Sequence, residues 1–244
     1  MLSLLLYKGS DLMGKPKVKS KAESQTAETP VPLNKRYTLG EEIFNSVSHG
    51  VGALLAIAGT VVLIVISALY TDPWGVVSSA IYGGSLIILY TMSTLYHAIT
   101  NEKAKHVMRV MDHVTIFLLI AGTYTPITLV PLRGTLGWVL FGFIWAAAIV
   151  GIVLNAIDLE RYRKISVVCY IVMGWAIIFA IVPLIQSLST LSLIFLLLGG
   201  ILYSVGVIFY AIKKIRYFHS IWHLFTIGGS VFHYFAILVS FLGK

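Results

Sequence analysis

The sequence predicts an all-α integral membrane protein, built as a bundle of seven transmembrane helices. Three observations support this prediction. Of the 244 residues, 58% are hydrophobic and 11% are charged, seven long apolar runs follow one another, and the basic residues gather in a few short segments. The mean hydropathy is +0.89. A soluble domain could not cover this much apolar surface, because exposed apolar patches rarely exceed a few hundred Å². The expected solvent is lipid.

The chain is expected to divide into a basic cytoplasmic tail over residues 1–36 and a transmembrane domain over residues 37–244. Residues 8–36 are rich in Lys, Ser, Thr, Glu and Pro and carry few apolar side chains. Because such a composition cannot offset the entropy lost on ordering, the tail is predicted to be disordered. The apolar stretch within residues 1–7 is too short for a signal peptide and has no basic region before it.

Each apolar run is long enough to cross a bilayer core, which takes about 20 residues of helix. The runs are continuous and do not alternate with polar residues, so they indicate helices and not the strands of a barrel. Pro126 and Pro183 are expected to kink or end the third and fifth helices. The predicted spans cover residues 46–70, 74–97, 112–131, 135–156, 165–186, 191–212 and 219–242.

The placement of Lys and Arg predicts the orientation of the bundle. Seven of these residues lie in the tail, and three follow each of the second, fourth and sixth spans. With seven spans, 16 of the 18 basic residues fall on one side, and only Arg133 and Lys244 fall on the other. The N-terminus is therefore expected in the cytoplasm and the C-terminus outside. The net charge of +8 reflects this asymmetry, so no nucleic-acid partner is expected.

Polar residues occupy the ends of three predicted spans. Ser93 and His97 close the second span, Asp112 opens the third, and His219 and His223 open the seventh. Polar side chains are costly within a membrane and usually mark function. In the seven-helix topology, all three ends lie on the cytoplasmic side. We therefore expect these side chains to meet at one depth in the membrane.

The residue types in this group predict a metal site. His219 and His223 are four residues apart and share one helix face, so both can bind one ion, and His97 would supply a third imidazole. Three neutral imidazoles with an open position are typical of catalytic zinc, although iron, nickel and copper also accept such ligands. Asp112 is the candidate to hold or deprotonate a water on the metal, and Ser93 the candidate to orient that water or a substrate oxygen.

The same residues also have structural interpretations. A histidine pair near an interface can contact lipid headgroups, and Asp112 can pair with Arg109. Glu42, Asn45 and His49 form a polar stripe at the start of the first span. This stripe either contacts the metal ligands and orients them or caps the helix. Convergence at one depth favours the metal interpretation.

Four short motifs follow one another along the chain: Glu42-x-x-Asn45, Ser93-x-x-x-His97, Asp112 and His219-x-x-x-His223. In this order they resemble the motifs of the hemolysin III family, which is the bacterial branch of the progestin and adipoQ receptor family. They are also similar to motifs of the alkaline ceramidases. The resemblance covers Tyr37 to the C-terminus. It implies a Zn²⁺ ion held by His97, His219 and His223, with Asp112 holding a water on the metal. It also implies an N-terminus in the cytoplasm.

Three functions fit these features. The first is zinc-dependent hydrolysis of a lipid amide or ester in a bacterial inner or plasma membrane, with Asp112 as the base and membrane lipid as the partner. The second is a non-enzymatic membrane-homeostasis sensor, in which zinc clamps the second and seventh helices. The third is a pore-forming cytolysin, as the family name suggests. The spans argue against the third, because none is an amphipathic element that could line a large pore.

Overall fold

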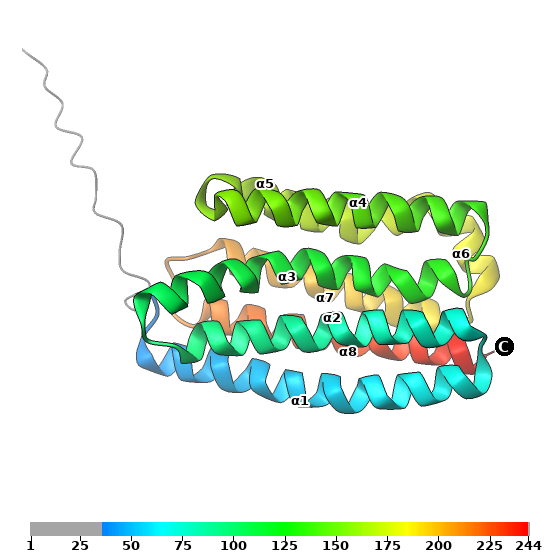
Figure 1. Cartoon of the computed structure of the whole chain (residues 1–244), viewed down its shortest axis with the longest axis horizontal. Coiled ribbons are helices and arrows are strands. Elements are labelled where there is room, and N and C mark those ends of the chain that lie inside the picture. Colours follow the sequence, from blue (N-terminus) through cyan, green and yellow to red (C-terminus); the bar gives the residue numbers. More distant parts are fainter. Residues whose placement is uncertain (1–35, 244) are drawn as a thin grey trace, which may run out of the picture. The chain divides into compact units, whose positions relative to one another are not determined.

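The computed structural model describes residues 36–243. The predicted disordered tail, apart from Arg36, lies outside the described residues. Within them, seven helices are long and apolar enough to cross a membrane, and they run side by side in a bundle (Figure 1). The predicted seven-helix membrane fold is confirmed.

The helices are, in chain order, α1 (Leu39–Tyr70), α2 (Pro73–Ala98), α3 (Glu102–Leu129), α4 (Thr135–Ile157), α5 (Leu159–Trp175), α6 (Ile181–Ser187), α7 (Thr190–Ala211) and α8 (Phe218–Leu242). The fifth span comprises α5, a 3₁₀ segment η2 (Ala176–Ala180) and α6.

Three helices begin earlier than the predicted spans: α1 by seven residues, α3 by ten and α5 by six. Polar residues cap these starts, because the side chains of Thr38, Asn101 and Asp158 accept hydrogen bonds from backbone N–H groups of the first turn. Hydropathy detects the apolar middle of a helix and misses its polar first turns. Lys105 and Arg109, expected in a loop, are helical and buried.

The break in the fifth span lies just before Pro183, which has no N–H to donate and crowds the carbonyl one turn earlier. Tyr124 of α3 satisfies backbone groups at this break. Its hydroxyl donates to the Met173 carbonyl over 2.7 Å and accepts from the Ile177 N–H over 2.9 Å. Pro126, in contrast, is accommodated inside α3.

The packing order of the helices determines which helix ends lie together. α1 packs against α2 and α8, α2 against α3, α3 against α4, and α7 against α8. Consequently, the beginnings of α1, α3, α5 and α8 meet the ends of α2, α4 and α7 at one end of the bundle (Figure 1). We call this the site end.

Candidate metal centre

Three histidines from α2 and α8 bring their ring nitrogens together at the site end. His219 Nε2 lies 3.3 Å from His97 Nε2 and 3.2 Å from His223 Nε2. One donor atom from each ring lies within 4.8 Å of the other two. His97 and His223 are buried. This buried cluster can hold a metal ion.

Two of the three distances between these nitrogens fit a tetrahedral ion. With metal–nitrogen bonds of about 2.05 Å meeting at tetrahedral angles, two ligand nitrogens of Zn²⁺ lie about 3.3 Å apart. The two Nε2–Nε2 distances, 3.3 and 3.2 Å, match this value. The donor set of three imidazoles is also one that zinc accepts. The residues present therefore fit the metal that the motifs imply.

The turn before α8 positions its two histidines. Tyr217 adopts a left-handed conformation with φ 63°, which bulky residues rarely do. Its N–H donates to Glu41 Oε1 over 2.7 Å, so α1 fixes the turn. The four-residue spacing then places His219 and His223 on one helix face.

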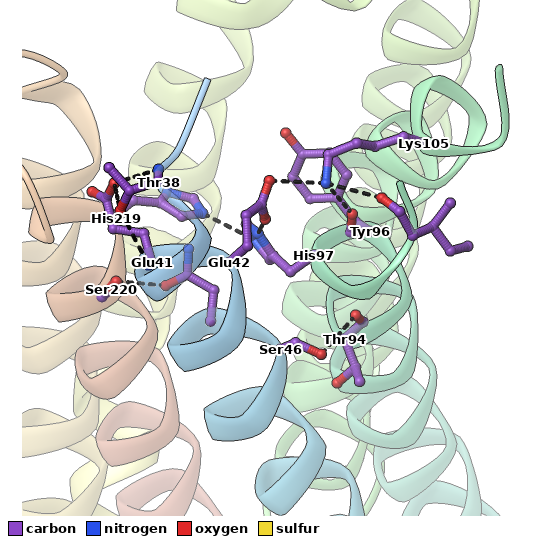
Figure 2. A network of polar contacts seen from close by, with 12 residues as sticks. Thr38, Glu41, Glu42, Ser46, Thr94, Tyr96, His97, Lys105, His219 and Ser220 are labelled. Atoms are coloured by element: carbon purple, nitrogen blue, oxygen red, sulfur yellow. Dashed lines mark hydrogen bonds and ion pairs between the residues drawn. The ribbon is translucent and has the colours of Figure 1, made fainter. Parts of the chain in front are cut away.

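Glu42 of α1 orients His97. Glu42 Oε2 lies 2.6 Å from His97 Nδ1, and Figure 2 shows the carboxylate beside the ring. A proton on Nδ1 donates to this oxygen and leaves Nε2 with its lone pair toward His219. Carboxylates fix the tautomer of metal-ligating histidines in this way.

Lys105 completes the surroundings of Glu42, a role that its position in the sequence does not indicate. Its Nζ lies 2.9 Å from Glu42 Oε1 and donates to the carbonyls of Tyr96 and Ile99 over 3.0 and 3.2 Å (Figure 2). A lysine between two spans is ordinarily a topology signal. No spacing rule could have separated it from Lys103, which is exposed.

Asn45 and His49, the other members of the predicted polar stripe, face α8. The Ser220 hydroxyl donates to Asn45 Oδ1 over 2.6 Å. His49 stacks on His223, with ring centroids 3.6 Å apart. All three residues of the stripe thus contact the cluster or the helix that carries it, which is more than a helix cap would require.

Asp112 lies ten residues into α3, about 15 Å beyond its start. It is not among the mutually close donors in the described part of the chain. It faces Ser93, one turn deeper than His97, and interacts electrostatically with Tyr37 and Tyr210. Ser93 is buried, and its hydroxyl lies beside the Asp112 carboxylate.

The alternative partner of Asp112, Arg109, is engaged elsewhere. The Arg109 guanidinium donates to Glu160 of α5, and the same Glu160 oxygen accepts from Arg36 over 3.1 Å. Among the described residues no ion pair joins Arg109 to Asp112. Asp112 Oδ2 instead lies 3.6 Å from His113 Nδ1, which also faces the Arg109 carbonyl oxygen at 2.8 Å.

The segment before α1 covers the cluster. The Tyr37 ring stacks on His219 with centroids 4.8 Å apart and lies 5.5 Å from the His97 ring. Burial raises the pKa of the Tyr37 phenol well above its usual range, and the neighbouring Tyr96 adds to this effect. The phenol stays protonated and can donate a hydrogen bond at the mouth of the centre.

A sequence profile described as "Haemolysin-III related" matches residues 37–234, a stretch that includes all the motif residues above. The chain belongs to this family. Two relatives come from Bacillus: "Hemolysin-3 homolog" of Bacillus subtilis (strain 168) is 48% identical over 202 residues, covering 83% of this chain and 95% of that protein. "Hemolysin-3" of Bacillus cereus is 46% identical over 198 residues, covering 81% and 90%.

A more distant relative is human "Monocyte to macrophage differentiation factor". It is 31% identical over 219 residues, covering 84% of this chain and 87% of that protein. The hemolysin III resemblance seen in the motifs is thus confirmed, and it extends to an animal protein. This chain is a multi-pass membrane protein of that family with a buried histidine cluster.

In this hemolysin III family member, an apolar cavity of about 100 Å³ begins one helical turn deeper than the cluster. Leu89 lies four residues before Ser93 on α2, and Thr226 lies three residues after His223 on α8. A second cavity of about 300 Å³ shares part of this wall and extends along α5, η2 and α6. The shared wall consists of Thr123, Tyr124, Gly174, Trp175, Gly200 and His233.

Proposed function

We propose that this protein is a zinc-dependent hydrolase that cleaves an amide or ester of a membrane lipid. The observation that carries the proposal is the triad of His97, His219 and His223, spaced for one ion, with Ser93 one turn deeper on α2 and Asp112 facing Ser93. We infer that the protein resides in the cytoplasmic membrane of a bacterium, in keeping with its Bacillus relatives.

The proposed chemistry divides the work between the ion and the side chains. A Zn²⁺ ion bound by the triad would supply the Lewis acidity that polarises a carbonyl and lowers the pKa of water to about 7. The Asp112 carboxylate accepts a proton from the attacking water and returns it to the leaving nitrogen or oxygen. The Ser93 Oγ donates a hydrogen bond to the substrate oxygen. Tyr37 limits the access of bulk water.

The cavities support a lipid substrate. Their walls are mostly apolar, and the smaller cavity begins about one helical turn from the triad on α8, at Thr226. The acyl chain of a lipid can lie there while its carbonyl lies at the triad. A small polar substrate would leave this apolar space without a partner.

The test is an acyl-release assay on detergent-purified, zinc-loaded protein with ceramides and ester lipids. Asp112→Ala is expected to lower turnover by about 10²–10⁴-fold, the usual contribution of a general base, while the zinc content stays unchanged. The proposal is overturned if fully loaded wild type cleaves none of these lipids. Turnover by Asp112→Ala at the wild-type rate would equally overturn it.

The division of the triad between α2 and α8 favours a second candidate, a membrane-state sensor in which zinc clamps these helices. The clamp depends on the histidines alone. Under this alternative, His219→Ala destabilises the fold and abolishes the response to membrane state, whereas Asp112→Ala leaves both intact.

A further inference from the structure

Lys105 is buried in the bundle, with 2% of its side chain exposed. Lysine is almost never fully buried unless it is paired. It lies in the first turn of α3, and its side chain reaches the beginning of α1 and the end of α2 (Figure 2). Its burial therefore requires partners from both helices.

The ammonium group has three protons and faces three oxygen atoms, two as hydrogen-bond acceptors and one in an ion pair. Two are the carbonyls of Tyr96 and Ile99, at 3.0 and 3.2 Å. These belong to the C-terminal end of α2, where unpaired carbonyls carry partial negative charge. The third is Glu42 Oε1, at 2.9 Å. Lys105 thus closes the end of α2 and holds a carboxylate of α1.

The two oxygens of Glu42 have different partners. Oε1 faces Lys105 at 2.9 Å, and Oε2 faces His97 Nδ1 at 2.6 Å (Figure 2). The position of one oxygen sets the position of the other, because the carboxylate is rigid. A shift of the ammonium would therefore turn the His97 ring.

We propose that Lys105 is a positioning residue of the metal centre, which holds the Glu42 carboxylate in place and thereby turns the His97 Nε2 lone pair toward the ion. This inference rests on the proposed metal site. It assigns to α3 an influence, through Glu42 of α1, on the candidate ligand His97 of α2.

If Lys105 were only a clamp between helices, the single and double variants would show a different pattern of metal affinities. A clamp acts on stability whatever residue 42 is, so its effect adds to that of any change at Glu42. A positioning residue acts through Glu42, and its effect disappears once the carboxylate is removed. A double-mutant cycle on metal affinity separates the two.

The experiment titrates the purified, metal-free full-length chain with Zn²⁺ against a competing chelator. Lys105→Met and Glu42→Gln are each expected to weaken binding by about 10–100-fold, the usual cost of losing a residue that supports a metal ligand. The double variant is expected to bind no more weakly than the weaker single variant. Lys103→Met, an exposed lysine in the same helical turn, is the matched control and keeps wild-type affinity.

The Lys105→Arg variant provides a second measurement if Lys105→Met fails to fold. Its planar fork cannot meet two carbonyls and a carboxylate at one point. Affinity is expected to fall severalfold, and not to fall further in a Glu42→Gln background. Wild-type affinity in the Lys105 variants, or losses that multiply in the double variant, overturn the inference. Absence of zinc binding by wild type overturns the metal site itself.

Discussion

His49 of α1 lies face to face with His223 of α8, with ring centroids 3.6 Å apart and ring planes 15° apart. Neither ring nitrogen of His49 has a hydrogen-bond partner in the described part of the chain. Tyr90 contacts the His49 ring edge-on at 5.0 Å. The contact of His49 with the triad is therefore made by its ring face, which restricts the rotation of His223.

This stack predicts that ring shape matters more than ring nitrogens at position 49. His49→Ala should weaken zinc binding by up to about tenfold, the lower end of the range for residues that support ligands, because His223 gains rotational freedom. His49→Phe keeps an aromatic face and should bind almost as tightly as wild type. Equilibrium titration with Zn²⁺ checks both. Equal losses in the two variants would show that the nitrogens matter.

Metal removal should loosen the site end. The candidate ligands come from α2 and α8, and Glu42 of α1 contacts one of them. A ligand present at 100 times its Kd stabilises the folded state by about 2.7 kcal/mol. Chelation is expected to lower the Tm of wild type accordingly, as followed by thermal unfolding in detergent.

The control for this prediction compares two histidines. His223→Ala removes a triad nitrogen and should abolish the metal-dependent change in Tm. His106 is exposed on α3, so His106→Ala should keep the change in full. A metal-dependent Tm in the His223 variant equal to that of wild type would contradict the proposed ligand set.

The sequence was sufficient to predict the features that follow from the bilayer and from the order of the helices along the chain. A bilayer requires long apolar helices, so their number could be counted, and antiparallel succession brings alternate helix ends together, so the proximity of His97 to His219 could be foreseen. The roles of Ser93 and Asp112 stay predictions. The contacts of Lys105 and Tyr37 were not foreseeable, because they depend on side-chain packing among several helices and on where the capped starts of α1 and α3 lie.

Close packing of α7 and α8 predicts that Gly199 tolerates no side chain. A Cβ there would collide with the His233 ring and lie 3.0 Å from the Gly229 carbonyl oxygen. Gly199→Ala is expected to destabilise the fold by about 1–3 kcal/mol, the usual cost of overpacking. Gly84→Ala is the control, since nothing lies within 4 Å of a Cβ there. In detergent unfolding, Gly199→Ala as stable as Gly84→Ala would contradict this packing.

The charge distribution predicts that the site end faces the cytoplasm, and exposed positions at the two ends of the bundle allow a direct measurement. Thr135 begins α4 at the opposite end, and Lys214 follows α7 at the site end; both are exposed. After replacement of Cys169 by serine, Thr135→Cys should react with a membrane-impermeant maleimide in intact cells. Lys214→Cys should react only after permeabilisation, because positively charged loops remain on the cytoplasmic side. The reverse pattern would place the histidine triad at the outer surface and exclude a cytoplasmic source of its metal.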